Sequence, residues 1–120
     1  MRGPLAFLVT AALCLAQGVW ERKADFPLLA TEVSAAVIDG KAYEVCGFMA
    51  QGASNRLFVY DPRVDQWTER APAPLDGGGD HCNVAAAGGK LYLLGAIRVG
   101  TSFIDGNTYE FDPATDRWTT

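Results

Sequence analysis

The chain has 120 residues, of which 49% are apolar and 20% charged, a composition typical of globular rather than disordered or fibrous proteins. Its formal net charge is −4 and it has no basic run, which excludes the cationic surface of a nucleic-acid-binding protein. One His and three Cys, without Cys-x-x-Cys or His-x-x-x-His spacing, exclude a zinc module, so we expect no metal and no cofactor.

The N-terminal segment is typical of a secretory signal peptide. Arg2 precedes an apolar run, Leu5–Ala16, and the next charge is Glu21. The run is shorter than the ~20 residues that a membrane-spanning helix needs. We therefore predict a signal peptide over residues 1–16, with cleavage after residue 18 or a buried helix as alternatives. The mature protein would be secreted or periplasmic, with no stable membrane anchor.

The remainder, residues 17–120, contains an internal repeat. Trp20–Leu28 matches Trp67–Leu75 at a constant offset, and the segment 60–67, Tyr-Asp-Pro-x-x-Asp-x-Trp, matches 111–118, Phe-Asp-Pro-x-x-Asp-x-Trp. These matches predict two units, about 28–71 and about 75–120. Residues 20–23 match the fourth strand of a unit and precede the first one.

Each unit has four strand-like runs separated by turn residues, and helical periodicity is absent. The expected strands are 33–38, 41–48, 56–60 and 66–70, then 84–87, 90–97, 108–111 and 117–119. Asp39-Gly40 and Gly88-Gly89 predict two-residue hairpin turns. Asp-Pro at 61 and 112 predicts the next tight turn, and local turn hydrogen bonds would also explain Asp65 and Asp116. Each unit is therefore expected to be a four-stranded antiparallel meander.

The side chains indicate how the sheets pack. Leu57–Tyr60 and Leu91–Leu94 are continuously apolar, which predicts that both faces of these strands are covered. The leading strands, 35–37 and 84–87, hold small residues that suit crowding towards a common axis. Together these patterns predict an all-β fold, with sheets arranged as the blades of a β-propeller.

The repeated residues resemble the Kelch repeat. They are Tyr60, Asp61, Trp67, Phe111, Asp112 and Trp118. The paired glycine of that family is degenerate here, as Cys46-Gly47 and Gly95-Ala96. The resemblance implies that Trp67 and Trp118 pack between neighbouring sheets and that His81, just ahead of a first strand, is structural.

The longer loops, 49–55, 72–83 and 98–107, are expected on one face of the propeller and are the predicted binding surface. The candidate binding residues there are Asp80, His81, Asn83, Arg98 and Asp105. The run Asp76-Gly-Gly-Gly-Asp80 is interpreted as a flexible connector. No catalytic residue is assigned.

Two cysteines remain after removal of the signal peptide, Cys46 and Cys82. Both are expected towards the same end of adjacent sheets. They could pair as a disulfide in an oxidising compartment, or they could stay as two buried thiols.

Function follows from the resemblance rather than from a catalytic constellation. It implies an exported Kelch-repeat module that binds a protein or a carbohydrate and is not an enzyme. The alternative is the N-terminal fragment of a propeller enzyme, such as a cofactor-free sialic acid mutarotase. Closed propellers have 4 to 8 blades, so two units form an incomplete ring. We expect the remaining blades in a longer chain of roughly 300–400 residues, or self-association of several copies.

Overall fold

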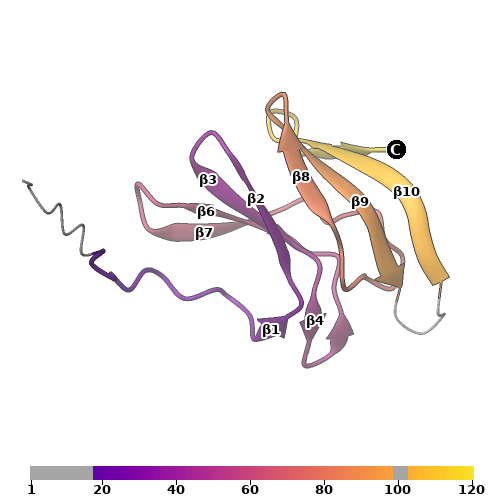
Figure 1. The fold of residues 1–120 in the computed structure, drawn as a ribbon, viewed down its shortest axis with the longest axis horizontal. Helices are drawn as coiled ribbons and strands as arrows, with labels where there is room; N and C mark the ends of the chain where they lie inside the picture. The colour runs from indigo at the N-terminus through magenta and orange to yellow at the C-terminus, as the bar shows by residue number, and fades with distance from the viewer. Residues whose placement is uncertain (1–17, 99–102) are drawn as a thin grey trace, which may run out of the picture.

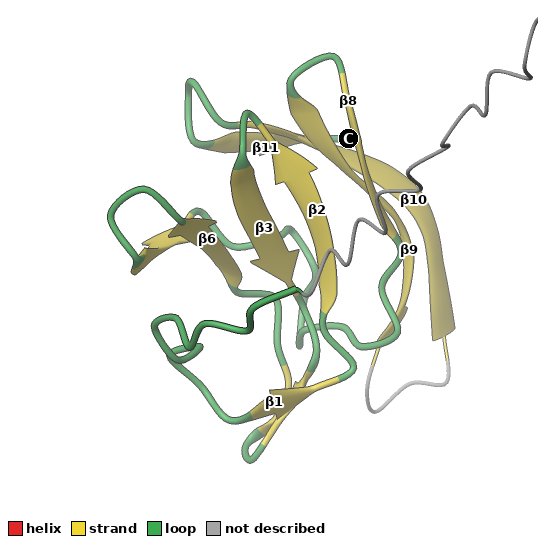
Figure 2. Cartoon of the chain, turned by 60° about the vertical axis from the view of Figure 1, so that its left-hand side comes forward, coloured by secondary structure: helices red, strands yellow, loops and turns green. Residues whose placement is uncertain are grey.

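The computed structural model describes residues 18–98 and 103–120, apart from the side chains of Arg98 and residues 103–105. The predicted signal peptide, residues 1–16, lies outside this range. The described chain consists of strands, turns and irregular segments arranged in two four-stranded sheets and one three-stranded sheet (Figures 1 and 2). The prediction of an all-β fold is confirmed, and the two large sheets do not close into a ring.

Both large sheets are antiparallel meanders, as predicted. The first has the order β2-β3-β6-β7, with β2 (Ser34–Ile38), β3 (Lys41–Val45), β6 (Leu57–Asp61) and β7 (Gln66–Arg70). The second has the order β8-β9-β10-β11, with β8 (Val84–Ala87), β9 (Lys90–Arg98), β10 (Phe103–Asp112) and β11 (Arg117–Thr119). Strand β10 begins before the predicted residue 108, and a register shift between residues 105 and 108 interrupts its pairing with β9.

The tight turns follow the predicted chemistry. Asp39 and Gly40 have φ values of 48° and 73°, so the β2–β3 turn needs the left-handed conformation that Gly adopts freely and Asp tolerates. In the β6–β7 turn, the Asp61 carboxylate accepts a hydrogen bond from the backbone N–H of Arg63 at 3.0 Å. The carboxylate of Asp112 accepts one from Ala114 at 2.8 Å in the equivalent turn of the second sheet.

The small sheet was not predicted. It has the order β1-β4-β5, with β1 (Ala30–Thr31), β4 (Phe48–Met49) and β5 (Gly52–Ala53). The single strand expected over 41–48 is interrupted after Val45, because Cys46 and Gly47 have φ values of 65° and 108°. A Cβ atom at Gly47 would lie only 2.6 Å from Cγ1 of Val33. The chain can therefore pass this close to Val33 only with glycine at position 47.

The main core lies between the two large sheets. Val45, Leu57, Leu91, Leu93 and Phe111 are fully buried there, each with 0% exposure. The ring of Tyr43, on the first sheet, lies 6.3 Å from that of Phe111, on the second. The adjacent sheets thus share one continuous hydrophobic core.

The expectation that both faces of each sheet are covered is right for the first sheet and wrong for the second. Phe58, on the far side of β6, is 3% exposed and packs edge-on against the ring of Phe26 at 5.2 Å. Leu94, on β9, is 47% exposed. Within the described residues, no preceding or following segment lies over Leu94 as residues 24–26 lie over the first sheet.

A pair of side chains holds the second sheet to the end of the first. The indole Nε1 of Trp118 donates a hydrogen bond to the backbone carbonyl of Ala71 at 2.8 Å. The carboxylate of Asp116 accepts a hydrogen bond from the backbone N–H of the same Ala71 at 3.1 Å. We call this arrangement the repeat clamp, because side chains two residues apart bind both polar groups of one residue in the preceding unit.

The first sheet makes the same clamp on the N-terminal segment. Trp67 Nε1 donates to the carbonyl of Ala24 at 3.1 Å, and Asp65 accepts from the N–H of Ala24 at 2.8 Å. The interpretation of Asp65 and Asp116 as makers of local turn bonds is therefore wrong, because both bind a distant backbone amide. Residues 20–23 form no strand, and Trp20 is 100% exposed.

We predict that Trp118→Ala destabilises the fold by about 3 kcal/mol, because it removes a half-buried indole packed against the core together with its hydrogen bond to Ala71. Trp20→Ala is the matched control and should leave stability unchanged, since that indole is fully exposed. Thermal or urea unfolding of both variants checks this. Equal losses of stability in the two variants would contradict a stabilising role for the repeat clamp.

The Tyr60 hydroxyl donates to the carboxylate of Asp65 at 2.6 Å, and this bond raises the pKa of Tyr60 to about 12. Because the folded-state pKa is raised, this contribution to stability is present below pH 10 and is lost as pH rises towards 12. Asp65→Asn should bring the Tyr60 pKa back towards its ordinary value, as measured by NMR titration of labelled tyrosine. Tyr92, whose pKa is raised by its hydrogen bond to Glu110, should not respond. A Tyr60 pKa that is equal in both proteins would refute the assignment.

Candidate functional site

The two large sheets present two distinct ends (Figure 1). One end, the turn end, carries the tight turns β2–β3, β6–β7, β8–β9 and β10–β11. The other, the loop end, carries the small sheet and the connector 71–83 between the large sheets. Binding residues were predicted at the loop end.

A cleft of about 710 Å³ opens at the turn end, between the two sheets. Ile38, Tyr43 and Val59 contribute apolar side chains from the first sheet. The charged and polar residues of its lining come from both units: Asp39, Lys41, Asp61, Gln66, Thr68, Arg70, Lys90 and Asp112. The cleft is therefore a property of the two units together.

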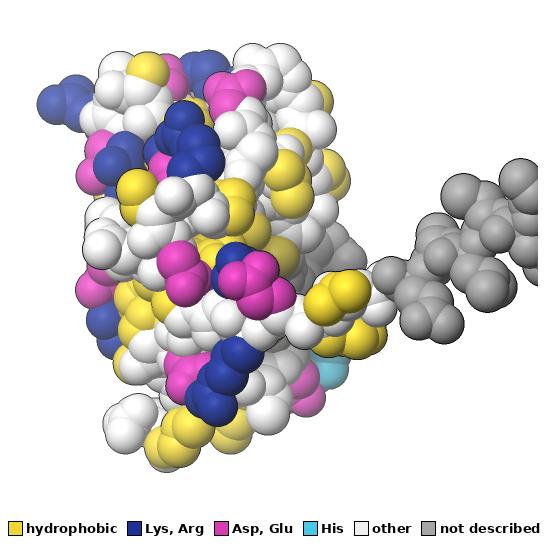
Figure 3. Space-filling view, turned by 90° about the vertical axis from the view of Figure 1, so that its left-hand side faces the viewer, with side chains coloured by type: hydrophobic (Ala, Val, Ile, Leu, Met, Phe, Trp, Pro, Cys, Tyr) yellow, Lys and Arg dark blue, Asp and Glu magenta, His cyan; other side chains and the backbone are white. Residues whose placement is uncertain are grey.

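Ion pairs at equivalent positions of the two units border the cleft. Lys41 Nζ lies 3.0 Å from Asp61 Oδ2, and Lys90 Nζ lies 2.6 Å from Asp112 Oδ2. Arg63 also pairs with Asp61, at 2.8 Å. Figure 3 shows basic and acidic side chains interspersed over one face of the molecule.

These pairs set the charge state of the carboxylates. Hydrogen bonds from Arg63, and then from Lys41, hold the pKa of Asp61 far below its ordinary value. The hydrogen bond from Lys90 lowers the pKa of Asp112, and the same bond raises the pKa of Lys90. Both carboxylates are therefore ionised at neutral pH, which suits binding and makes them poor proton donors or acceptors.

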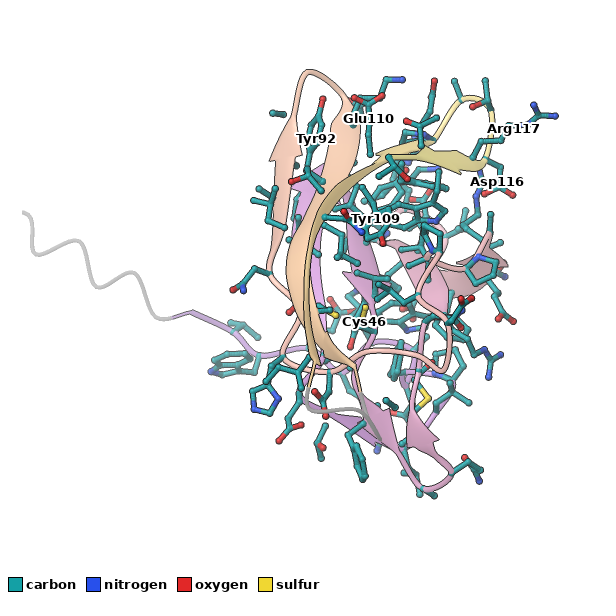
Figure 4. The ribbon with its side chains drawn as sticks, turned by 90° about the vertical axis from the view of Figure 1, so that its right-hand side faces the viewer. Cys46, Tyr92, Tyr109, Glu110, Asp116 and Arg117 are labelled. Carbon is teal, nitrogen blue, oxygen red and sulfur yellow. The ribbon has the colours of Figure 1, made fainter. Side chains whose placement is uncertain are left out.

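Arg70 connects the two sheets at the wall of the cleft. Its Nη2 donates to the carbonyl of Pro113 at 2.9 Å. Its Nε lies 3.2 Å from Asp116 Oδ1, an ion pair without the alignment of a hydrogen bond. In the second sheet, the Tyr92 hydroxyl donates to Glu110 at 2.9 Å near the turn end, outside the lining of the cleft (Figure 4).

At the loop end the structure brings together two of the predicted residues and one that the sequence reasoning missed. Nδ1 of His81 lies 3.3 Å from Asp80 Oδ1 and 3.5 Å from Glu32 Oε2. The His81 side chain is exposed, whereas Asp80 is buried. No sequence signal marks Glu32, because it lies in the other unit and only the tertiary fold brings it close.

The other predicted residues do not join this group through described contacts. The backbone N–H of Asn83 donates to the carbonyl of Gly95, and its carbonyl accepts from Leu94, while Asn83 itself is exposed. Arg98 ends β9 and Asp105 lies on β10, but their side chains lie outside the described part of the structure.

Comparison with known proteins agrees with this architecture. Residues 30–74 match the family model of the Kelch motif. The chain contains Kelch repeats. It is 36% identical over 84 residues to Kelch-like protein terF of Aspergillus terreus, covering 68% of this chain and 16% of that protein. It is 30% identical over 98 residues to Kelch-like protein 35 of Mus musculus, covering 80% of this chain and 15% of that protein.

A solved structure shows the same fold. The structure of YjhT superposes with a TM-score of 0.73 at 21% identity, covering 84% of this chain and 40% of that one. The Kelch repeats described here thus span less than half of these relatives. No helix in the described residues is long and apolar enough to cross a membrane.

The glycine run between the Kelch repeats is packed, so its interpretation as a flexible connector is wrong. The N–H of Gly79 donates to the carbonyl of Ser54, and its own carbonyl accepts from Gly47, both at 3.0 Å. Residues 78–80 are buried. The missing side chains allow the connector backbone to approach β5 closely: a Cβ atom at Gly78 would lie 2.5 Å from the carbonyl oxygen of Ala53.

Cys46 and Cys82 lie in the same buried cluster, with 1% and 4% exposure, as free thiols. Figure 4 shows Cys46 in the interior of the molecule. A hydrogen bond with Cys82 and burial raise the pKa of Cys46, which keeps it in the unreactive thiol form. The tertiary structure brings the two cysteines together as buried thiols, and their pairing as a disulfide in an oxidising compartment stays an untested alternative.

We predict that Gly78→Ala destabilises the protein more than Gly77→Ala, by at least about 1 kcal/mol. Both glycines have positive φ, at 82° and 78°, so both substitutions carry the left-handed penalty of about 1–2 kcal/mol. Only Gly78 adds a clash with backbone, because a Cβ atom at Gly77 meets nothing within 4 Å. Denaturant unfolding measures the loss of unfolding free energy in each variant. Equal losses would contradict the prediction and would mean that the connector backbone moves to accommodate the added Cβ atom.

Proposed function

We propose that these Kelch repeats are part of an exported module that binds a protein or a glycan and takes no catalytic part itself. The observation that carries the proposal is the cleft of about 710 Å³ at the turn end, lined by side chains of both repeats. A concave site with apolar walls and a few oriented charges is the usual form of a ligand site.

A protein ligand is favoured over a glycan. Kelch modules generally bind proteins, and the Lys41–Asp61 and Lys90–Asp112 pairs offer both signs of charge to a partner surface. Tyr43, the aromatic residue of the lining, is only 6% exposed. It therefore offers little ring surface for stacking on a sugar.

The electrostatics support a binding role over proton-transfer catalysis. General acid–base catalysis needs a group whose pKa lies near the working pH. The pKa values of Asp61 and Asp112 are shifted in the opposite direction, away from neutrality. The carboxylates of the cleft instead serve as fixed charges.

The decisive experiment blocks the cleft without breaking an ion pair. Thr68 is exposed and lines the cleft, so Thr68→Trp should obstruct it. Thr119→Trp, at an exposed residue of β11 that lies outside the lining, is the matched control. Arrays of secreted proteins and of glycans are probed with the 120-residue chain and both variants. We expect a ligand that is lost with Thr68→Trp and kept with Thr119→Trp, and retention by both variants would refute the cleft as its site.

A second measurement tests the proposal that the module is not catalytic. Anomer conversion of α-sialic acid by the chain should not exceed the spontaneous rate, and a faster rate would favour the enzyme alternative.

Export predicts that the protein isolated from its source begins near Gln17, because the charge at Arg2 and the short apolar run have the order of a signal peptide. N-terminal sequencing tests this, and a protein retaining Met1 in the cytosol would contradict it.

A further inference from the structure

Three metal-binding side chains converge at the loop end, away from the cleft. They are Glu32, which follows β1, and Asp80 and His81 of the connector, and their ligand atoms all lie within 4.8 Å of one another. We infer that these three residues form a binding site for a divalent transition-metal ion, with Zn²⁺ as the best fit.

The distances match a single ion. Nδ1 of His81 lies 3.3 Å from the nearer Asp80 oxygen and 3.5 Å from the nearer Glu32 oxygen. Ligands placed about 2.0 Å from a tetrahedral ion are separated by about 3.3 Å. Both distances from His81 match this spacing, and the two carboxylates, within 4.8 Å of each other, would close around the ion.

The charge balance also calls for a cation. Two carboxylates and a neutral imidazole carry a charge of −2. Among the described side chains, neither Glu32 nor Asp80 pairs with a Lys or an Arg, and His81 is the one partner of each. The Asp80 side chain is only 11% exposed, and a carboxylate with so little solvent around it is costly without a countercharge. A dication would balance both carboxylates.

The backbone holds two of the ligands in place before any ion binds. Asp80 exchanges two 3.0 Å backbone hydrogen bonds with Ile97 of β9. Glu32 follows Thr31, which pairs with Phe48 in the small sheet. Glu32 is thus attached to the small sheet and Asp80 to the edge of β9, so an ion would link the small sheet to the second repeat.

The ligand set selects the class of metal. Imidazole with carboxylates suits Zn²⁺ and its transition-metal neighbours, whereas Ca²⁺ takes six to eight oxygen ligands. Three protein ligands leave a fourth position for water or for a group of a partner. A metal site here departs from the expectation of no metal, which rested on the small number of His and Cys and on the absence of closely spaced motifs; Glu32 is distant along the chain from Asp80 and His81, and two of the three ligands are carboxylates.

The test uses the 120-residue chain with Zn²⁺ alone. We expect one Zn²⁺ per chain by isothermal titration, weakened at least about tenfold by His81→Ala and by Glu32→Gln, both at exposed residues. Asp25→Asn, an exposed carboxylate paired with Arg22, is the control and should leave the affinity unchanged. Failure of this test leaves the cleft proposal untouched, because the two sites share no residue.

His81 is the only histidine, so NMR of its ring reports on this site alone. Zn²⁺ should shift the Nδ1 resonance strongly, since Nδ1 faces both carboxylates. Co²⁺ used as an optical probe should show no thiolate charge-transfer band. Affinity weaker than about 1 mM, an unshifted His81 ring, or a thiolate band would each overturn the proposal.

Discussion

The architecture depends on one recurring contact, in which an Asp and a Trp two residues apart hold both backbone polar groups of an alanine that precedes their own unit. Asp116 and Trp118 hold Ala71, and Asp65 and Trp67 hold Ala24. A backbone N–H and a carbonyl at the same residue can be satisfied together only if the next unit lies at a defined distance and angle. The clamp therefore fixes how one sheet stacks on the next.

The shared core follows from that placement. With the sheets held side by side, Tyr43 and Val45 from the first meet Leu91 and Phe111 from the second. The clamp also explains why the N-terminal segment covers Phe58 while forming no strand. Ala24 is bound in the same way as Ala71, and this brings Phe26 over the first sheet.

The two ends of the stack differ in chemistry because they differ in origin. The turn end is built from residues that recur in each unit, so Lys41–Asp61 and Lys90–Asp112 are copies of one ion pair. The loop end is built from the parts of the units that do not match, namely the small sheet and the glycine connector. A cleft bordered by repeated ion pairs and a cluster of unrepeated side chains, Glu32, Asp80 and His81, therefore coexist on one small scaffold.

Local patterns accounted for most of the fold. The strand-like runs and the Asp39-Gly40 and Asp-Pro turns between them predicted the meanders, because hairpin geometry is decided by residues adjacent in the chain. The break after Val45 was hidden, since Cys46 adopts a left-handed conformation that no local rule requires of a cysteine. The glycines of the connector suggested flexibility, and only the neighbouring backbone of residues 53–54 shows that they serve close packing.

The amino-acid sequence by itself determined the repeat, the strands and the residue types of each turn, because these follow from short-range conformational preference. Tertiary structure alone decided which distant groups meet. Asp65 was predicted to accept a hydrogen bond from the local backbone, and the backbone amide that it binds is that of the distant Ala24; Glu32 carries no signal until the fold sets it beside His81. The physical reason is that a side chain's partner depends on the relative position of whole sheets, and this position is set by the clamp and the core together.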